Sequence, residues 1–235
     1  LLIEEVTGME FSQYMKDEVL IPLGMNSSSF NWEKELHSKT SKAYDHFGKV
    51  LPNFEFSEKA AAGLYTTVDD FAKFAAAGLE KGEIQNVGMG ILTSETLRLM
   101  YTPVQKDYGL GYIIETFSDG TRVISHGGTN QGWRSQFAII PGIESGIIIL
   151  TNSENGKKLH QDVLSLWVRW KTGFAPEVYY KNTVAGITLR VIAVLLLLGV
   201  IYFTSRVVSQ ILKGNRVFFI KCWDKSARQL AIRII

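Results

Sequence analysis

The feature that most constrains this sequence is an apolar run near its C-terminal end. Val184 to Phe203 spans 20 residues with one charge, Arg190. As a helix with about 1.5 Å rise per residue, the run measures roughly 30 Å, the thickness of a bilayer's hydrocarbon core. Its uninterrupted part, Val191 to Phe203, has 13 residues, a length that also suits a buried core helix. We expect a transmembrane helix over 184–203, because Arg190 lies near one end and can extend to the headgroups.

Basic residues beyond the run favour one orientation. Seven lysines and arginines but a single acid, Asp224, follow it, and within 20 residues on each side four basic residues follow the run and three precede it. Cytoplasmic flanks carry the excess of positive charge, so we expect a cytoplasmic tail and an extracellular globular domain in the cell membrane. Two alternatives stay open for the tail: it lies on the membrane surface, or it leads into further spans. The expected organisation is a globular part at 1–173, a linker at 174–183, the span at 184–203 and a basic tail at 204–235.

Composition argues against several classes of function. The 25 basic and 23 acidic residues give a net charge of +2, and no basic stripe with interleaved aromatic residues is present. We therefore expect no nucleic-acid partner. The single cysteine, Cys222, excludes an internal disulfide and a cysteine-based metal site. We expect no metal and no cofactor, and no secretory signal opens the sequence.

Helical and strand patterns both occur in residues 1–173. Helices are expected at 1–7, 11–20, 67–79, after Thr93 and at 156–171. We expect the last helix to pack on a sheet through one apolar stripe, which consists of Leu159, Val163, Leu166, Trp167 and Trp170. Strands are expected at 110–117, 121–125, 134–140 and 146–151, with turns at 118–120 and 141–142. Residues 26–62 lack a periodic pattern and are expected to be irregular.

These patterns predict the α+β class, an antiparallel sheet flanked by helices and followed by a transmembrane helix. The apolar run Ile147 to Leu150 suggests a central strand that is covered on both faces.

The clearest chemical signal is the segment Ser125-His126-Gly127-Gly128-Thr129-Asn130. A histidine ends a predicted strand, and two glycines follow it. Glycine allows the backbone to approach a ligand where a side chain would block it. A lone histidine in a hairpin is more often a hydrogen-bonded structural residue, so the segment by itself favours the structural interpretation.

This segment resembles the third motif of class C β-lactamase-like serine hydrolases. That motif is Lys-Thr-Gly in the lactamases and His-x-Gly in several esterase and peptidase relatives. Other segments resemble the same family in the same order: Val6-Thr7-Gly8, Ile21-Pro22-Leu23-Gly24-Met25 before Ser29-Phe30, Ala62-Gly63-Leu64-Tyr65-Thr66-Thr67 with Asp70-Phe71, Tyr108-Gly109-Leu110-Gly111-Tyr112, and Leu150-Thr151-Asn152-Ser153. The resemblance covers residues 1 to about 172 and implies a fold of the β-lactamase and penicillin-binding-protein type.

The resemblance implies roles for the residues of this motif. His126 would line the active site, place a substrate carboxylate or carbonyl and tune proton transfer. The backbone N–H of Thr129 would be one donor of the oxyanion hole, and Gly127, Gly128 and Asn130 would contact substrate. Histidine rather than lysine favours an esterase or peptidase over a β-lactamase, because no permanent cation would face a lactam carboxylate.

The other two motifs of the family are missing from these 235 residues. The family's nucleophile is the serine of Ser-x-x-Lys, and no serine here has a lysine three residues later. Tyr180-Lys181-Asn182 spells the second motif, Tyr-x-Asn, but it follows the third motif and adjoins the apolar run. Both motifs precede the third one in the family. We therefore expect them upstream of Leu1, with this chain as the C-terminal part of the domain.

The remaining polar residues give weaker signals. His37, His46 and His160 show no metal-ligand spacing, and His160 is expected on the polar face of its helix. Asp45-His46 is a poor candidate for a catalytic dyad. Asp69-Asp70 stands at a helix start, where the helix dipole favours acids, and is interpreted as structural.

Two hypotheses follow for function. In the first, the chain is part of a membrane-anchored extracytoplasmic serine hydrolase of β-lactamase, D-Ala carboxypeptidase or esterase type. It would act through an acyl-enzyme on a small-molecule or peptide substrate such as a cell-wall precursor. In the second, it is a non-catalytic, membrane-anchored cell-wall-binding module of the same fold. A blander alternative is a fragment that exposes apolar surface and aggregates.

Overall fold

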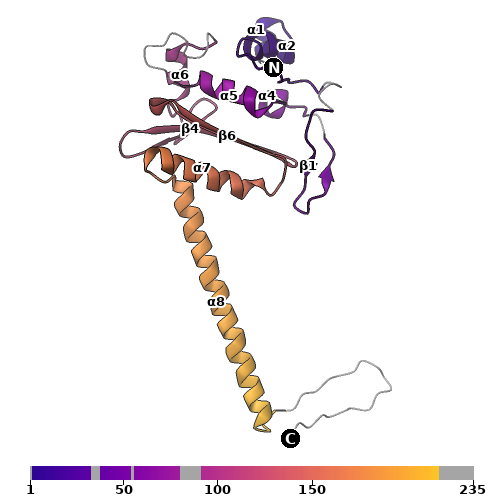
Figure 1. Ribbon diagram of the computed structural model, residues 1–235, viewed down its shortest axis with the longest axis vertical. Coiled ribbons are helices and arrows are strands. Elements are labelled where there is room, and N and C mark those ends of the chain that lie inside the picture. Colours follow the sequence, from indigo (N-terminus) through magenta and orange to yellow (C-terminus); the bar gives the residue numbers. More distant parts are fainter. Residues whose placement is uncertain (1, 33–37, 54–55, 80–90, 217–235) are drawn as a thin grey trace, which may run out of the picture. The chain divides into compact units, whose positions relative to one another are not determined.

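Four antiparallel strands form the centre of the structure, a computed structural model that describes residues 2–32, 38–53, 56–79 and 91–216. Each strand pairs with the next one along the chain, so the sheet has the order β3-β4-β5-β6 (Figure 1). The strands are β3 (Ile113–Thr116), β4 (Arg122–Asn130), β5 (Trp133–Ile140) and β6 (Ser145–Thr151). The predicted antiparallel sheet is confirmed.

Helices cover both faces of the sheet (Figure 1). α5 (Val68–Ala77) and α6 (Ser94–Met100) pack on one face, and α7 (Gly156–Thr172) packs on the other. Successive residues of a strand point to opposite faces, so β4 and β5 contribute to both layers. The first layer buries Ala75, Leu97, Tyr101, Ile114, Ile124, Phe137 and Ile139. The second buries Val123, Ala138, Ile140 and Val168.

Threonine caps determine where α5 and α6 begin. The Thr67 hydroxyl accepts a hydrogen bond from the Asp70 N–H at 3.2 Å, and the Thr93 hydroxyl accepts one from the Thr96 N–H at 3.1 Å. The first residues of both helices agree with the prediction from the sequence. α5 ends at Ala77, with Gly78 as its C-cap, slightly before the predicted end near Leu79.

The N-terminal segment packs on α5 through an apolar cluster of its own. α1 (Leu2–Thr7) ends before Gly8, whose φ is +70°. α2 (Phe11–Met15) continues into η1 (Lys16–Leu20), a π-helical turn, and the two together form the helical stretch expected over 11–20. The cluster consists of Phe11, Leu20, Leu23, Met25 and Phe30, with Phe74 and Ala77 of α5 packed against it.

Residues 26–62 were expected to be irregular, and this prediction was wrong in two places. β1 (Ala43–Tyr44) and β2 (Val50–Leu51) form a short hairpin, and α4 (Lys59–Ala62) is one helical turn. Elements of two to four residues are too short to show a period, so composition alone does not reveal them.

Two strands also differ from expectation. β4 does not end at His126 but pairs with β5 as far as Asn130, so the two glycines lie inside the strand. β6 was predicted to be central, yet among the described residues it pairs only with β5 and lies at the sheet edge. Its apolar run is nevertheless covered on both faces, because Ile148 packs in the α5 layer and Ile147 in the α7 layer.

Only part of the predicted stripe of α7 packs on the sheet: Trp167 does, and Val163 is half-buried. Leu159, Leu166 and Trp170 are 52%, 59% and 73% exposed. The side that meets the sheet carries buried His160 and Val168, with Leu164 and Trp167 packed in the same layer. The predicted stripe therefore straddles the exposed side and the sheet side of this helix.

α8 (Glu177–Leu212) contains all of the expected span 184–203. The chain divides into two compact units, Leu1–Tyr179 and Tyr180–Ile235, and α8 starts within the residues expected to form a linker. Its part Tyr179–Leu212 is long and apolar enough to cross a membrane, and no part of its most apolar stretch is buried. Most of the expected tail, residues 217–235 with Cys222, lies outside the described residues.

A buried phenol links α6 to the end of α5 and allows a first prediction. Tyr101 is fully buried, and its hydroxyl donates to the Gly78 carbonyl at 2.9 Å. Tyr101→Phe is expected to lower the free energy of unfolding by about 1 kcal/mol, because the carbonyl loses its partner away from water. Urea unfolding of the full chain in detergent measures this, with exposed Tyr108→Phe as a control. An unchanged midpoint for Tyr101→Phe would show that the hydrogen bond contributes nothing.

Candidate active site

The third-motif residues lie on the part of β4 that extends past β3. The last pair between β3 and β4 is Ile113 with Ser125, whereas the pairing of β4 with β5 continues to Asn130. Residues 126–130 therefore have a paired side, toward β5, and a side on which the described residues provide no strand. All of them except Asn130 are exposed. The strand thus presents an open backbone edge at the predicted site.

The strand register shows which amides point to this open edge. At the β3–β4 turn, the Phe117 N–H donates to the Thr121 carbonyl at 2.9 Å, so the polar groups of Thr121 face β3. Backbone polar groups alternate in direction along a strand, and the β3–β4 and β4–β5 registers contain no irregularity. The N–H groups of Gly127 and Thr129 therefore point to the open side, as an oxyanion-hole donor at Thr129 requires.

Glycine at two positions keeps this region of the sheet compact. A Cβ on Gly128 would collide with the Ser135 hydroxyl on β5. Gly132 turns the β4–β5 hairpin with φ +72°, and a Cβ there would lie 2.7 Å from that of Ala43. A larger residue at 128 would therefore displace the Ser135 hydroxyl, beside the candidate oxyanion donor.

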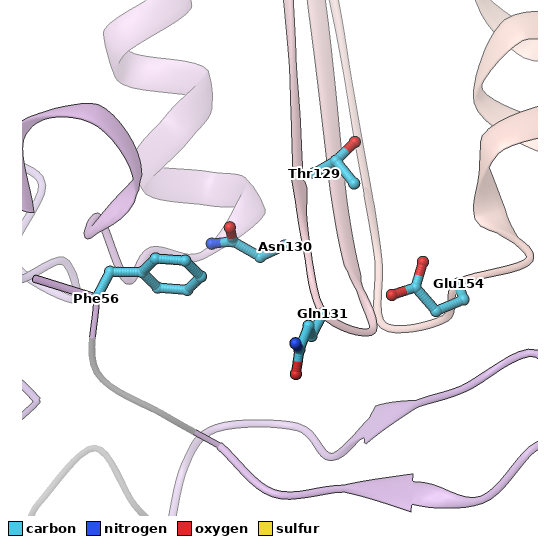
Figure 2. A pocket seen from close by; sticks show the side chains of 5 residues that line it. All are labelled: Phe56, Thr129, Asn130, Gln131 and Glu154. Carbon is cyan, nitrogen blue, oxygen red and sulfur yellow. The ribbon is translucent and has the colours of Figure 1, made fainter. Parts of the chain in front are cut away.

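A depression of about 360 Å³ lies at the tip of this hairpin (Figure 2). Its lining residues are Phe56, Thr129, Asn130, Gln131 and Glu154. Figure 2 shows Asn130 directed toward Phe56, and Thr129 on the other side of the strand with Glu154. The Asn130 amide donates to the Ala62 carbonyl at 3.3 Å, which joins β4 to α4.

The structure brings together only part of the predicted set. Thr129 and Asn130 line the depression, whereas His126, Gly127 and Gly128 do not. His126 lies three residues before Thr129, about 10 Å along an extended strand, and alternation puts its side chain on the same sheet face as Asn130. The open edge of β4, rather than the depression, connects all five residues.

An ion pair that the sequence did not reveal holds the hairpin. Arg134 donates to the Glu154 carboxylate at 2.9 Å, to the Glu154 carbonyl at 3.1 Å and to the Thr129 hydroxyl at 3.1 Å. The Glu154 carboxylate also accepts from the Gly132 N–H at 2.8 Å. The Gly132 N–H, and then the charge of Arg134, outweigh burial and lower the pKa of Glu154. No spacing rule connects residues 134 and 154, so only the fold identifies this pair.

His160 is not on the polar face of α7, contrary to the prediction. It is 5% exposed, and its Nε2 lies 3.0 Å from the Thr151 hydroxyl on β6. Burial, and then the charge of Arg134, lower its pKa below the usual value. His160 is thus a structural residue between helix and sheet.

A pH dependence of stability follows from His160. Its pKa is lower in the folded state, so the unfolded chain binds more protons at mildly acid pH. The contribution of neutral His160 to the free energy of unfolding is fully present above the unfolded pKa of about 6.5. It decreases as the pH falls toward the folded pKa. His160→Gln keeps a polar partner for Thr151 and should weaken this dependence. Melting temperatures between about pH 7.5 and 5.5 measure the effect, and equal slopes for both proteins would contradict it.

The weaker candidates form no second site among the described residues. The Asp45 carboxylate accepts from the N–H groups of Phe47 and Lys49, both at 2.8 Å, and so stabilises its own turn. His46 Nδ1 instead lies 3.0 Å from Asn155 Oδ1. His37 is outside the described residues. No group of three metal-ligating side chains occurs where the structure describes the chain.

An antiparallel sheet between two helical layers, with an open strand at the third motif, is typical of β-lactamase-like and penicillin-binding-protein-like folds. A penicillin-binding protein homologue from Pyrococcus abyssi, described as octameric, superimposes with a TM-score of 0.57 and 27% sequence identity over 71% of this chain and 40% of its own. A beta-lactamase/D-alanine carboxypeptidase from Pseudomonas syringae shares the fold, with a TM-score of 0.54 and 16% identity over 64% of this chain and 50% of its own.

Residues 1–166 match the beta-lactamase family, so the chain belongs to this family. A human beta-lactamase-like protein is 22% identical over 149 residues, which are 60% of this chain and 29% of that protein. The chain thus spans half or less of the length of these relatives.

Proposed function

We propose that this chain forms one wall of the active site of a membrane-anchored, extracytoplasmic serine hydrolase. The Thr129 N–H supplies one oxyanion-hole donor, and His126 orients the substrate and tunes proton transfer. The nucleophilic serine and its lysine lie outside these 235 residues, none of which form a Ser-x-x-Lys motif. The reaction passes through an acyl-enzyme on a peptide, lactam or ester bond, and cell-wall precursors are the proposed substrate class.

The observation that carries the proposal is the open edge of β4 at Gly127 and Thr129. Backbone N–H groups that point to open space beside a depression are suited to bind a carbonyl oxygen as it acquires negative charge. A non-catalytic relative would not need this edge to stay open. Histidine at 126 favours a peptidase or esterase within the family, and one of the solved neighbours is described as a D-alanine carboxypeptidase.

The membrane anchor is part of the same proposal. α8 has the length and composition of a single span, and its exposed apolar surface needs an apolar environment. By the positive-inside rule, the basic tail favours an orientation with the globular part outside the cell.

Covalent labelling with a fluorophosphonate and a fluorescent penicillin tests the proposal. A protein that joins these residues to an upstream Ser-x-x-Lys segment should be labelled, and the 235-residue chain alone should not. Gly128→Val should reduce labelling about tenfold, less than the 10²- to 10³-fold effect of losing an oxyanion donor, because the Thr129 N–H remains while the added side chain displaces the Ser135 hydroxyl beside it.

Gly142→Val is the matched control, because a Cβ at Gly142 meets no atom within 4 Å. Its labelling should equal that of the unaltered protein. If the Gly128→Val variant were labelled as strongly as the unaltered protein, the result would contradict the assignment of β4 to the active site. No labelling of a correctly folded long protein by either probe would favour the non-catalytic binding module.

A further inference from the structure

α4 is a helix of one turn that Lys59 ties to the N-terminal segment. A four-residue helix has too few internal hydrogen bonds to be stable on its own. The Lys59 ammonium donates to Asn31 Oδ1 at 2.7 Å and to the hydroxyl of Ser12 at 3.4 Å. Ser12 is buried, and the Glu10 carboxylate lies 4.0 Å from the ammonium. Lys59 therefore holds α4 against two parts of the N-terminal segment, α2 and the loop at residue 31.

The other end of α4 meets the candidate active site. Ala62 is the last residue of α4, and the last carbonyls of a helix have no partner inside it. The Ala62 carbonyl accepts instead from the Asn130 side-chain amide at 3.3 Å. Asn130 is the last residue of β4 and follows Thr129, whose N–H is the proposed oxyanion donor. A single helical turn thus connects the Lys59 ammonium to the end of β4.

This connection acts on the part of β4 that has a strand on one side only. Beyond Ser125, β4 pairs with β5, and the described residues provide no strand on its other side. Hydrogen bonds to β5 fix one edge of this part, and the bond from Asn130 to α4 fixes one face. The groups of an active site must be held within about 0.5 Å of the productive geometry, so the second fixation bears on the Thr129 N–H.

We infer that Lys59 is a positioning residue of the proposed active site, which acts through α4 and Asn130 on the placement of the Thr129 N–H. The inference rests on the proposed function, because it concerns the rate at which the nucleophilic serine reacts. Lys59 does not contact substrate. It keeps α4 in the place where the Ala62 carbonyl holds Asn130.

Labelling kinetics of the protein that carries the upstream Ser-x-x-Lys segment test this role. Lys59→Met keeps an unbranched side chain but removes the ammonium. It should lower the first-order rate constant at saturating fluorophosphonate about tenfold, because displacement of an oxyanion donor costs less than its loss. The probe concentration that gives half of this rate should change by less than about twofold, since Lys59 does not bind the probe.

A double-variant cycle shows whether Lys59 acts through Asn130. Asn130→Ala alone should slow labelling to a similar extent, and the further change Lys59→Met should then slow it by less than about twofold. Gly63→Ala disturbs α4 by a second route, because a Cβ at Gly63 would lie 2.7 Å from the Lys59 Cα. This variant should slow labelling as well, although it removes no side chain.

Lys73→Met is the matched control. The Lys73 ammonium donates to the Gly24 carbonyl and to the Asp70 carboxylate, so it also ties the N-terminal segment to a helix, but that helix is α5. The substitution should lower the melting temperature and leave the rate constant of labelling unchanged well below that temperature. An equal loss of rate in Lys73→Met and Lys59→Met would show that Lys59 only stabilises the fold.

Hydrogen exchange of the 235-residue chain in detergent separates this inference from the proposed function, because it needs no activity. Lys59→Met should accelerate exchange at the Asn130 amide at least about threefold more than at the amides of β6. Unchanged exchange at Asn130, or fully multiplied losses in the double variant, would overturn the positioning role. If exchange responds as expected but neither probe labels the longer protein, the failure belongs to the proposed function, and the connection from Lys59 to β4 is retained.

Discussion

Asp70→Ala is expected to lower the free energy of unfolding by about 3 kcal/mol, the largest effect of the substitutions considered. The Asp70 carboxylate is 4% exposed and accepts three hydrogen bonds. The donors are the Ser27 N–H at 2.7 Å, the Ser28 hydroxyl at 2.9 Å and the Lys73 ammonium at 2.7 Å. Hydrogen bonds to a charged group contribute more than neutral ones, and all three are lost together.

Hydrogen exchange of the β5 amides in the full chain measures this effect. Asp69→Ala is the matched control, because Asp69 is the neighbouring acid in the same helical turn and is exposed. Its effect should stay within about 0.5 kcal/mol, as for other surface substitutions. Equal effects of the two alanines would mean that the contact with residues 27–28 is unimportant.

Acid should produce part of the same effect without a substitution. Burial tends to raise the pKa of Asp70, but the hydrogen bonds from Lys73, Ser28 and the Ser27 N–H outweigh it and lower the pKa. Such a carboxylate contributes fully above its unfolded pKa of about 3.9, and the contribution is lost as pH falls through the folded pKa. Asp70→Asn should therefore be less sensitive to acid than the unaltered chain.

Arg134→Ala is expected to cost about 2–3 kcal/mol and to loosen the candidate site at the same time. The Arg134 and Glu154 side chains are only 14% and 18% exposed, and removal of one partner leaves a largely buried charge. The Thr129 hydroxyl and the Gly132 turn also lose their support. Hydrogen exchange should accelerate at the Asn130 amide, which faces β5, more than at the amides of β3.

A lysine at the same position separates charge from geometry. Arg134→Lys keeps the charge but cannot make the planar, multiple hydrogen bonds of the guanidinium, so it should recover less than half of the loss. Arg98→Ala, an exposed arginine on α6, serves as the control. Uniform acceleration over the whole sheet, without emphasis on the Asn130 amide, would show that Arg134 stabilises the fold but does not position the site.

The sheet and its major helices could be predicted because their signals are local. Threonine caps at 67 and 93, turn residues at 118–120 and alternating apolar residues depend on neighbours only a few positions away. The third motif rests instead on a resemblance to a family and stays a prediction, and its residues continue β4 instead of ending it.

The rest depends on contacts between distant residues. Nothing in the sequence indicates that Asp70 meets residues 27–28, that Arg134 meets Glu154, or that His160 turns toward Thr151. The stripe of α7 was only partly right, because apolar residues occur on both sides of this helix and periodicity cannot tell which side meets the sheet. The edge position of β6 was missed because an apolar run reports coverage of the two faces, not the number of neighbouring strands.

The strand order has a kinetic consequence. Every pair in the main sheet joins consecutive strands, so these contacts close short loops and are expected to form early in folding. The bond from Ser27 to Asp70 closes a separation of 43 residues and carries a larger entropic cost. It should form after the rate-limiting step, so loss of the Asp70 carboxylate should accelerate unfolding and leave the rate of folding nearly unchanged.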